Sequence, residues 1–324
     1  MSAHAIGGYF ELELPQPRPF PYPEAHRFQS ARSAFLALLR AGKPARVWMP
    51  RYLCDSMYAA LREAGVEAVP YAIDEQFEVV TEIDLHAGDW LYYVDYFGVC
   101  SDVVTRLLAQ FSPGQVVLDY CQAFFAPPRP CLAVIYSPRK FFCVPDGGLV
   151  VTDLPLEVPR EQDRLSKERA EALLERLAVS PESGYSSYVQ GESSLAELAP
   201  RRMSQLTSRI LASVDFASVR ARRNRNFRYL HERLGHLNRL ALDPERMDGP
   251  MCYPLLIEAE GLRAALIAQR VFVATYWPDV VEHAGSDSTE GRLVRQLLPL
   301  PCDQRYDEAD MARIVALCTQ FVNR

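Results

Sequence analysis

Apolar residues recur along the first half of the chain at two alternating spacings. A helical spacing, with apolar residues three or four positions apart, runs through SARSAFLALLRAG and stops at Gly42. Short apolar runs typical of buried strands alternate with such helical segments from about residue 28 to 152. The predicted strands are ARVWMP, EAVPYAI, DWLYYVDYFG, QVVLDY and LAVIYS, and the other predicted helices are SMYAALREAG and SDVVTRLLAQF, the latter with Ser101 as N-cap. This alternation predicts an α/β fold with a mostly parallel sheet, which binds ligands beyond the carboxyl ends of its strands.

The pattern changes after about residue 159. EQDRLSKERAEALLERLAV predicts a charged amphipathic helix, SPESGYSSYVQGESS a loop, and residues 203 to 235 one long helix. MCYPLLIEA and VFVATYW read as strands, with helices near 260 to 270 and 307 to 322, which together indicate a smaller C-terminal α+β domain. We therefore divide the chain into a large domain, 1–205, and a connecting helix with a small domain, 206–324. The Pro-rich segment PQPRPFPYP predicts an extended arm on the surface.

Composition narrows the class of protein. With 324 residues, of which 49% are hydrophobic, the chain can bury a sizeable core. A net charge of −6 argues against nucleic acid as a partner, and no apolar run reaches the roughly 18 to 20 residues that would cross a membrane. The N-terminal stretch does not have the pattern of a secretory leader, and the eight scattered cysteines suggest reduced thiols rather than disulfides or a metal site. We expect a cytoplasmic protein without a metal.

The segment VRARRNRNFR, residues 219–228, is a local exception to the acidic composition. It lies inside the long predicted helix. A solvated helix face is the favoured interpretation, and a face that binds phosphate or contacts a partner subunit is the alternative.

Two charged residues follow consecutive predicted strands. Asp119 closes QVVLD, and Lys140, one of three lysines in the chain, comes shortly after LAVIYS. If both strands belong to one sheet, the two side chains reach the same ligand-binding edge. They could form a structural ion pair, but a buried pair stabilises a protein poorly because desolvation offsets the attraction.

The other interpretation is a site for pyridoxal phosphate (PLP). This cofactor requires a lysine for its Schiff base, an acid that keeps the pyridine nitrogen protonated, and donors for its phosphate. Lys140 and Asp119 would meet the first two requirements, and Gln122 could donate its amide to the ring hydroxyl or instead satisfy backbone groups. The phosphate would lie at the start of the first predicted helix, where Ser30 could equally act only as a helix cap. Its expected ligands are Ala31, Arg32 and Ser33, with Ser137 as a further one.

The order of these segments resembles the DegT-like family of PLP-dependent aminotransferases, many of which act on nucleotide-linked keto sugars. VVLDYCQAFFA is similar to the family's strand that ends in Asp with Gln or His three places later, and YSPRKFFCVPDGG to its lysine segment. DYFG and RMSQLTSRIL are similar to two further family segments. The resemblance implies that Lys140 forms the Schiff base, that Asp119 and Gln122 contact the cofactor, and that Asp146 to Gly148 form an acidic-Gly-Gly turn. It also implies a fold-type I architecture, with a seven-stranded sheet flanked by helices, and a homodimer.

Three positions depart from the family pattern. Ala31 replaces the usual glycine of the phosphate loop, a change for which the Arg32 guanidinium could compensate. Cys54 stands where an aromatic residue usually stacks on the cofactor ring, and Tyr52 is the candidate substitute. Pro200 replaces an asparagine that usually reaches the partner subunit's cofactor.

The resemblance implies a PLP-dependent aminotransferase. We expect it to move an amino group, with glutamate as the default donor, through an aldimine on Lys140 to a keto sugar or a similar small carbonyl compound. Because of the departures, the alternative is a degenerate relative that binds a ligand or partner without transamination. A sugar dehydratase is disfavoured, because the dehydratases of this family carry a histidine in place of Lys140.

Overall fold

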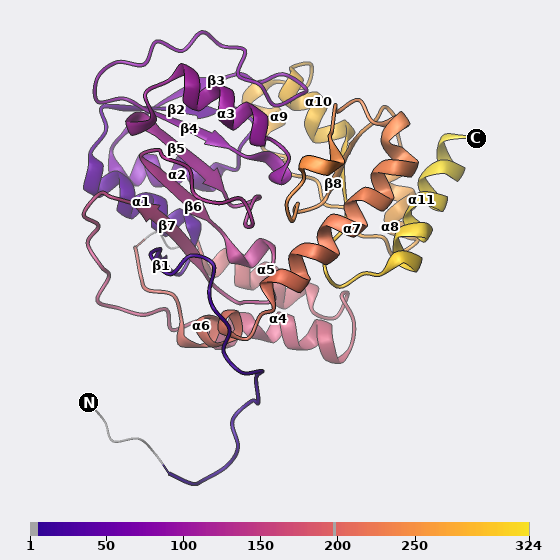
Figure 1. Cartoon of the computed structure of the whole chain (residues 1–324), viewed down its shortest axis with the longest axis horizontal. Helices are drawn as coiled ribbons and strands as arrows, with labels where there is room; N and C mark the ends of the chain where they lie inside the picture. The colour runs from indigo at the N-terminus through magenta and orange to yellow at the C-terminus, as the bar shows by residue number, and fades with distance from the viewer. Residues whose placement is uncertain (1–5, 197–198, 324) are drawn as a thin grey trace.

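A seven-stranded sheet forms the centre of the computed structural model, which describes residues 6–196 and 199–323 (Figure 1). Its strands are β1 (His26–Phe28), β2 (Arg46–Pro50), β3 (Glu67–Tyr71), β4 (Trp90–Val94), β5 (Val116–Tyr120), β6 (Ala133–Tyr136) and β7 (Gly148–Thr152). They lie in the order β1-β7-β6-β5-β4-β2-β3. The pairs from β3 to β6 are parallel, whereas β7 runs antiparallel to both β6 and β1. The predicted mostly parallel, seven-stranded sheet is confirmed.

The first three helices follow the predicted positions. They are α1 (Ala31–Gly42), α2 (Asp55–Ala64) and α3 (Ser101–Gln110). The N-cap of α1 is Ser30, whose hydroxyl accepts the Ser33 amide at 3.1 Å. The predicted cap of α3 is displaced by one residue, because Ser101 is the first helical residue and Cys100 holds the cap position without a side-chain bond.

The start of α1 lies directly on the start of β7. A Cβ atom on Gly148 would come within 2.1 Å of the Ser30 carbonyl carbon and 2.3 Å of the Ala31 nitrogen. Only glycine allows this backbone approach. The turn before β7 and the first turn of α1 therefore form one rigid unit.

The segment after β7 contains more helices than predicted. The charged helix is confirmed as α4 (Ser166–Ala178), but the predicted loop that follows contains α5 (Tyr185–Ser194). This helix packs against α4, and Arg169 donates from Nε to the Ser194 hydroxyl at 2.7 Å. Tertiary contact thus overrides the weak helix preference of a Ser/Gly-rich stretch.

The single long helix predicted over 203–235 is wrong. The chain forms α6 (Gln205–Ala212) and α7 (Phe216–Leu234), and the break lies at Ser213 to Asp215. Asp215 ends the helical path because its carboxylate accepts the Ser218 amide at 3.0 Å and begins α7 as its N-cap. The Pro-rich arm has no helix or strand, and the Arg18 amide donates to the Ala212 carbonyl at 2.7 Å, which ties the arm to this break.

A two-stranded sheet and several helices form the rest of the chain. They are β8 (Tyr253–Leu256), α8 (Leu262–Ala268), α9 (Val280–Ala284), α10 (Thr289–Gln296), β9 (Leu297–Leu300) and α11 (Glu308–Val322). The strand predicted in VFVATYW is wrong, because β9 pairs antiparallel with β8 instead and residues 271–277 are irregular. Val271 and Val273 are nevertheless buried, which explains the misleading apolar run.

Buried side chains form two clusters. The larger surrounds the seven-stranded sheet, and the smaller joins α7, α8, α11, β8 and β9, which Figure 1 shows beside the large sheet. Trp277, Val280 and Leu293 pack into the larger cluster although they follow position 206 in the sequence. The division into 1–205 and 206–324 stays a prediction. Within the described residues, no helix is both long and apolar enough to span a membrane.

Candidate active site

Asp119 lies near the carboxyl end of β5, and donors hold both of its oxygens. The Tyr92 hydroxyl donates to Oδ2 and the Cys121 amide to Oδ1, each at 2.8 Å. The side chain is only 4% exposed. Tyr92 belongs to the neighbouring strand β4, and the sequence analysis missed it because an aromatic residue in an apolar strand resembles ordinary packing. The two donors fix the orientation of the carboxylate.

Gln122 is fully buried and only half satisfied. Its Oε1 accepts the Phe97 amide at 2.8 Å, whereas its Nε2 has no hydrogen-bond partner among the described residues. An unpaired buried donor costs roughly 1–3 kcal/mol, so such a group marks the place of a missing ligand or water. Phe97 itself has φ 58°, a left-handed conformation that is rare for a bulky residue and that clusters at functional sites.

Lys140 ends a short 3-10 helix, η3 (Pro138–Lys140), that follows β6 and Ser137. Its side chain is exposed and forms no hydrogen bond or ion pair within the described parts of the chain. Burial raises the pKa of Cys121 well above its usual range, Asp119 raises it further, and Lys140 opposes the rise. Because charges interact strongly only at short range, Asp119 and Lys140 both lie near the thiol of Cys121. A direct Asp119–Lys140 ion pair is absent from this part of the structure.

Two arginines, Arg32 in the first turn of α1 and Arg139 in η3, approach Glu192 of α5. Arg32 donates from NH1 to the Leu195 carbonyl at 2.7 Å, and its buried Nε has no partner in the described structure. Burial lowers the pKa of Arg32, while Cys54 and Glu192 favour its charged form. Arg139, immediately before Lys140, binds Glu192 of α5. The sequence analysis missed this pair, because nothing in the sequence places α5 here.

The acidic-Gly-Gly turn connects the lysine segment to the rest of the fold. Asp146 is completely buried, and its carboxylate accepts the Ser204 amide and hydroxyl at 2.7 Å each, as well as the Thr207 hydroxyl. Burial raises the pKa of Asp146, and these hydrogen bonds oppose the rise. The turn therefore anchors the N-terminus of α6, while Gly148 supports α1.

Tyr52 is buried among aromatic side chains. Its ring lies 4.8 Å from that of Trp277 and 5.6 Å from that of Tyr96, in a buried aromatic cluster. Cys54, by contrast, lies close enough to Arg32, Tyr92 and Cys121 to contribute to the pKa shifts of all three. A stacking role for Tyr52 stays a prediction.

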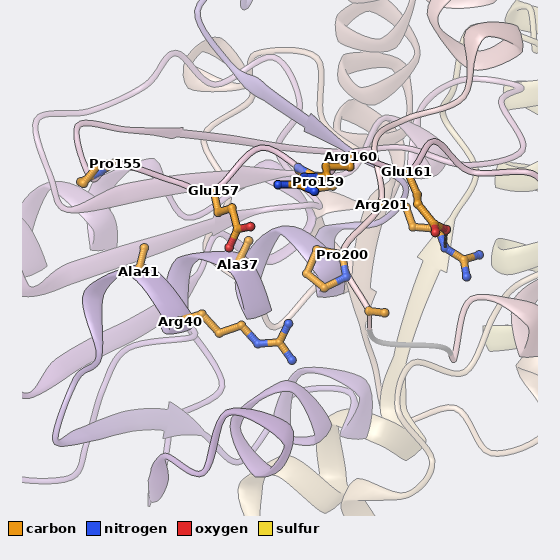
Figure 2. A pocket seen from close by; sticks show the side chains of 11 residues that line it. Ala37, Arg40, Ala41, Pro155, Glu157, Pro159, Arg160, Glu161, Pro200 and Arg201 are labelled. Atoms are coloured by element: carbon orange, nitrogen blue, oxygen red, sulfur yellow. Dashed lines mark ion pairs between the residues drawn. The ribbon is translucent and has the colours of Figure 1, made fainter.

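A surface groove of about 530 Å³ lies away from this site. Figure 2 shows that its lining comes from α1, from residues 155–161 and from residues 199–201, where Glu161 pairs with Arg201 at 3.7 Å. Pro200, one of the departures from the family pattern, lines this groove. None of the other predicted site residues does.

Solved structures with the same architecture cover most of the chain. DesV of S. venezuelae, in complex with a ketimine intermediate, superposes with a TM-score of 0.67 at 18% identity, over 93% of this chain and 85% of DesV. A DegT DnrJ EryC1 StrS aminotransferase from Brucella abortus gives 0.61 at 16% identity, over 92% and 85%. DesI, in the presence of its TDP-sugar product, gives 0.62 at 20% identity, over 91% and 80%. No protein-family model matches the chain, and no curated protein matches it in sequence.

The fold is that of the fold-type I PLP-dependent aminotransferases, as the resemblance implied. The residues present fit this cofactor. A free amine, a carboxylate with fixed orientation and an unpaired buried amide donor lie at one sheet edge, beside a helix N-terminus.

A second carboxyl group lies beside Asp119. The Asp95 amide donates to the Asp119 carbonyl at 3.0 Å, and its own carboxylate accepts the Cys100 amide at 2.8 Å. Burial, reinforced by Asp119, raises the pKa of Asp95 to about 7, although the Cys100 amide opposes the rise. The folded chain therefore keeps a proton on Asp95 that the unfolded chain releases near pH 4.

This difference predicts that stability falls as pH rises from about 4 to about 7. Between pH 5 and 8, Asp95 should lower the free energy of unfolding by about 2–3 kcal/mol, because above its unfolded pKa only the folded state retains the proton. Asp95→Asn, whose amide oxygen can still accept the Cys100 amide, should remove that loss. Urea unfolding at pH 5 and at pH 8 measures the change in the free energy of unfolding, and Asp153→Asn, at an exposed position, serves as the control. Equal pH dependence in the wild type and Asp95→Asn would contradict the prediction.

Proposed function

We propose that the protein is a PLP-dependent aminotransferase that moves an amino group, with glutamate as the donor, to a keto sugar, including a nucleotide-linked one, or a similar small carbonyl compound. The observation that carries the proposal is the unpaired Nε2 of Gln122 beside the fixed carboxylate of Asp119 and the free amine of Lys140. In this proposal, Gln122 is suited to the ring hydroxyl of the cofactor, Asp119 to its ring nitrogen and Lys140 to its aldehyde.

Each residue has a distinct task in this proposal. PLP supplies the electron sink that makes a proton on the substrate carbon labile. Lys140 would hold the cofactor through its amine, and as a free amine it would move the proton of the substrate carbon. Asp119, oriented by Tyr92, keeps the ring nitrogen protonated. Gln122 donates to the ring oxygen, while the first turn of α1 binds the phosphate through Ala31, Arg32 and Ser33, with Ser137 as a further ligand.

The choice of substrates is supported by charge and by the neighbours. Arg139 already holds a glutamate side chain, that of Glu192, next to Lys140, so the rim of the site is suited to a carboxylate. DesI was solved with a TDP-sugar product, which supports a sugar acceptor. A degenerate protein without transamination is not favoured, since both Lys140 and Gln122 keep functional groups free for a cofactor.

The proposal includes a cytoplasmic homodimer. All eight cysteines are free, as expected in a reducing compartment. Before the Pro-rich arm, residues 6–12 expose Ile6, Tyr9, Phe10 and Leu12 by 71% or more, an apolar surface suited to a partner subunit. Light scattering that gives the mass of a single chain at micromolar concentration would rule out the dimer.

The cofactor proposal predicts a visible absorption band at about 420 nm after incubation with PLP. Borohydride should fix the cofactor to the peptide that contains Lys140. Lys140→Ala should abolish this fixation, whereas Lys167→Ala, on the exposed face of α4, should retain it. Glutamate should then convert the band of the wild type to that of the amine form. A wild-type protein that takes up no PLP would overturn the proposal, and uptake without conversion by any amino donor would favour the degenerate alternative.

The donor proposal predicts opposite effects of the two members of one ion pair. Arg139→Gln should raise KM for glutamate about tenfold or more, because a hydrogen bond to a charged group contributes roughly 1.5–3 kcal/mol. Glu192→Gln should lower that KM, because it frees Arg139 from a competing carboxylate. Steady-state kinetics with glutamate and with an uncharged amino donor tests both effects. An equal rise for the two donors would show that Arg139 does not recognise the acid.

A further inference from the structure

A buried arginine contacts the lysine turn, which is the segment of residues 138–142 that contains Lys140. Arg223 of α7 is 2% exposed, and no carboxylate of the described residues bonds its guanidinium. Its NH1 donates to the carbonyls of Pro250 and Met251 at 3.0 Å each, its Nε to Gln304 Oε1 at 2.9 Å, and its NH2 to the Phe141 carbonyl at 3.3 Å. The guanidinium also lies 4.6 Å from the centre of the Phe141 ring. Arg223 thus joins α7, whose apolar face belongs to the smaller cluster, to Phe141 and Met251 of the larger one.

Burial of a charge without an acidic partner is costly, so this arrangement is not explained by stability alone. The nearby carboxylate of Asp303 favours the charge, but its oxygens accept hydrogen bonds from Arg305. Backbone carbonyls and the side-chain oxygen of Gln304 must therefore stabilise the charge of Arg223. They can do so only while all of these groups keep their positions.

The contacts of Arg223 complete a continuous path of hydrogen bonds from Gln122 to Phe141, the residue after Lys140. Gln122 Oε1 accepts the Phe97 amide, and the Phe97 carbonyl accepts the Met251 amide at 2.9 Å. The Met251 carbonyl binds Arg223, which binds the carbonyl of Phe141, the residue after Lys140. Gln304 Nε2 strengthens the last link, since it donates to the same Phe141 carbonyl at 2.7 Å.

We propose that Arg223 is a positioning residue that sets the lysine turn, residues 138–142, at a defined place relative to Gln122. The inference rests on the proposed function for the roles of Lys140 and Gln122. Arg223 does not touch the reacting atoms and acts through the Phe141 carbonyl. Loss of its contacts releases the lysine turn from the segment at 250–251, so that the amine and the amide no longer meet the cofactor together.

The test compares Arg223→Gln and Arg223→Lys with Arg225→Gln, an exposed arginine on the same helix. In the cofactor-free chain, hydrogen exchange at the amides of residues 140–142 should be about tenfold faster in Arg223→Gln, because a bond to a charged group is lost. Exchange in β5 should stay as in the wild type. The dissociation constant for PLP should rise about tenfold, with a smaller rise in Arg223→Lys, which keeps the charge but not the fork of donors.

The outcomes separate positioning from general stabilisation. Wild-type exchange at residues 140–142, or an increase shared equally by β5, would overturn the inference. If the wild type binds PLP, an equal dissociation constant for PLP in Arg223→Gln would also overturn it. If Arg223→Gln does not fold, the same two measurements on Arg223→Lys decide. Should the wild type take up no PLP, the proposed function fails, while the hydrogen exchange of the cofactor-free chain still tests the role of Arg223.

Discussion

The parallel register of the three central strands is the constraint on which the site depends. Val94 of β4 pairs with Asp119 of β5, which pairs with Ile135 of β6. All three strands are buried along their whole length, so a slip by one residue would turn apolar and polar side chains to the wrong faces. The register therefore brings the carboxylate of β5 and the lysine turn after β6 to one edge.

Contacts between distant segments then hold that edge in shape. Asp146 joins the lysine segment to α6, Gly148 joins it to α1, and Arg223 joins it to the smaller cluster. Each anchor is buried: Asp146 and Arg223 form several hydrogen bonds, and Gly148 packs its backbone against that of Ser30 and Ala31. Such contacts allow little movement, which suits the proposed site, where an amine, a carboxylate and an amide would meet three different groups of one cofactor.

The fold alone does not decide the activity. At 16–20% identity, the neighbouring structures share the architecture with this chain, and one architecture can carry different functions. The argument for transamination therefore rests on side chains. Within the described residues, Lys140 and Gln122 Nε2 have no hydrogen-bond partner, and Asp119 is fixed by donors from β4 and from its own turn.

The sequence by itself determined the alternating strands and helices of the first half and the expectation that Asp119 and Lys140 share an edge. Both depend on local periodicity and on a general rule for parallel sheets. The tertiary structure decided the rest. Helix α5 and the irregular course of residues 271–277 depend on contacts far apart in sequence, whereas the break at Asp215 comes from a local N-cap that helical periodicity does not reveal. Helical spacing from Phe227 and Leu230 does place Arg223 on the buried face, but its partners, Phe141 and Met251, are 82 and 28 residues away. No local pattern records bonds of that range, because each depends on how the whole chain closes.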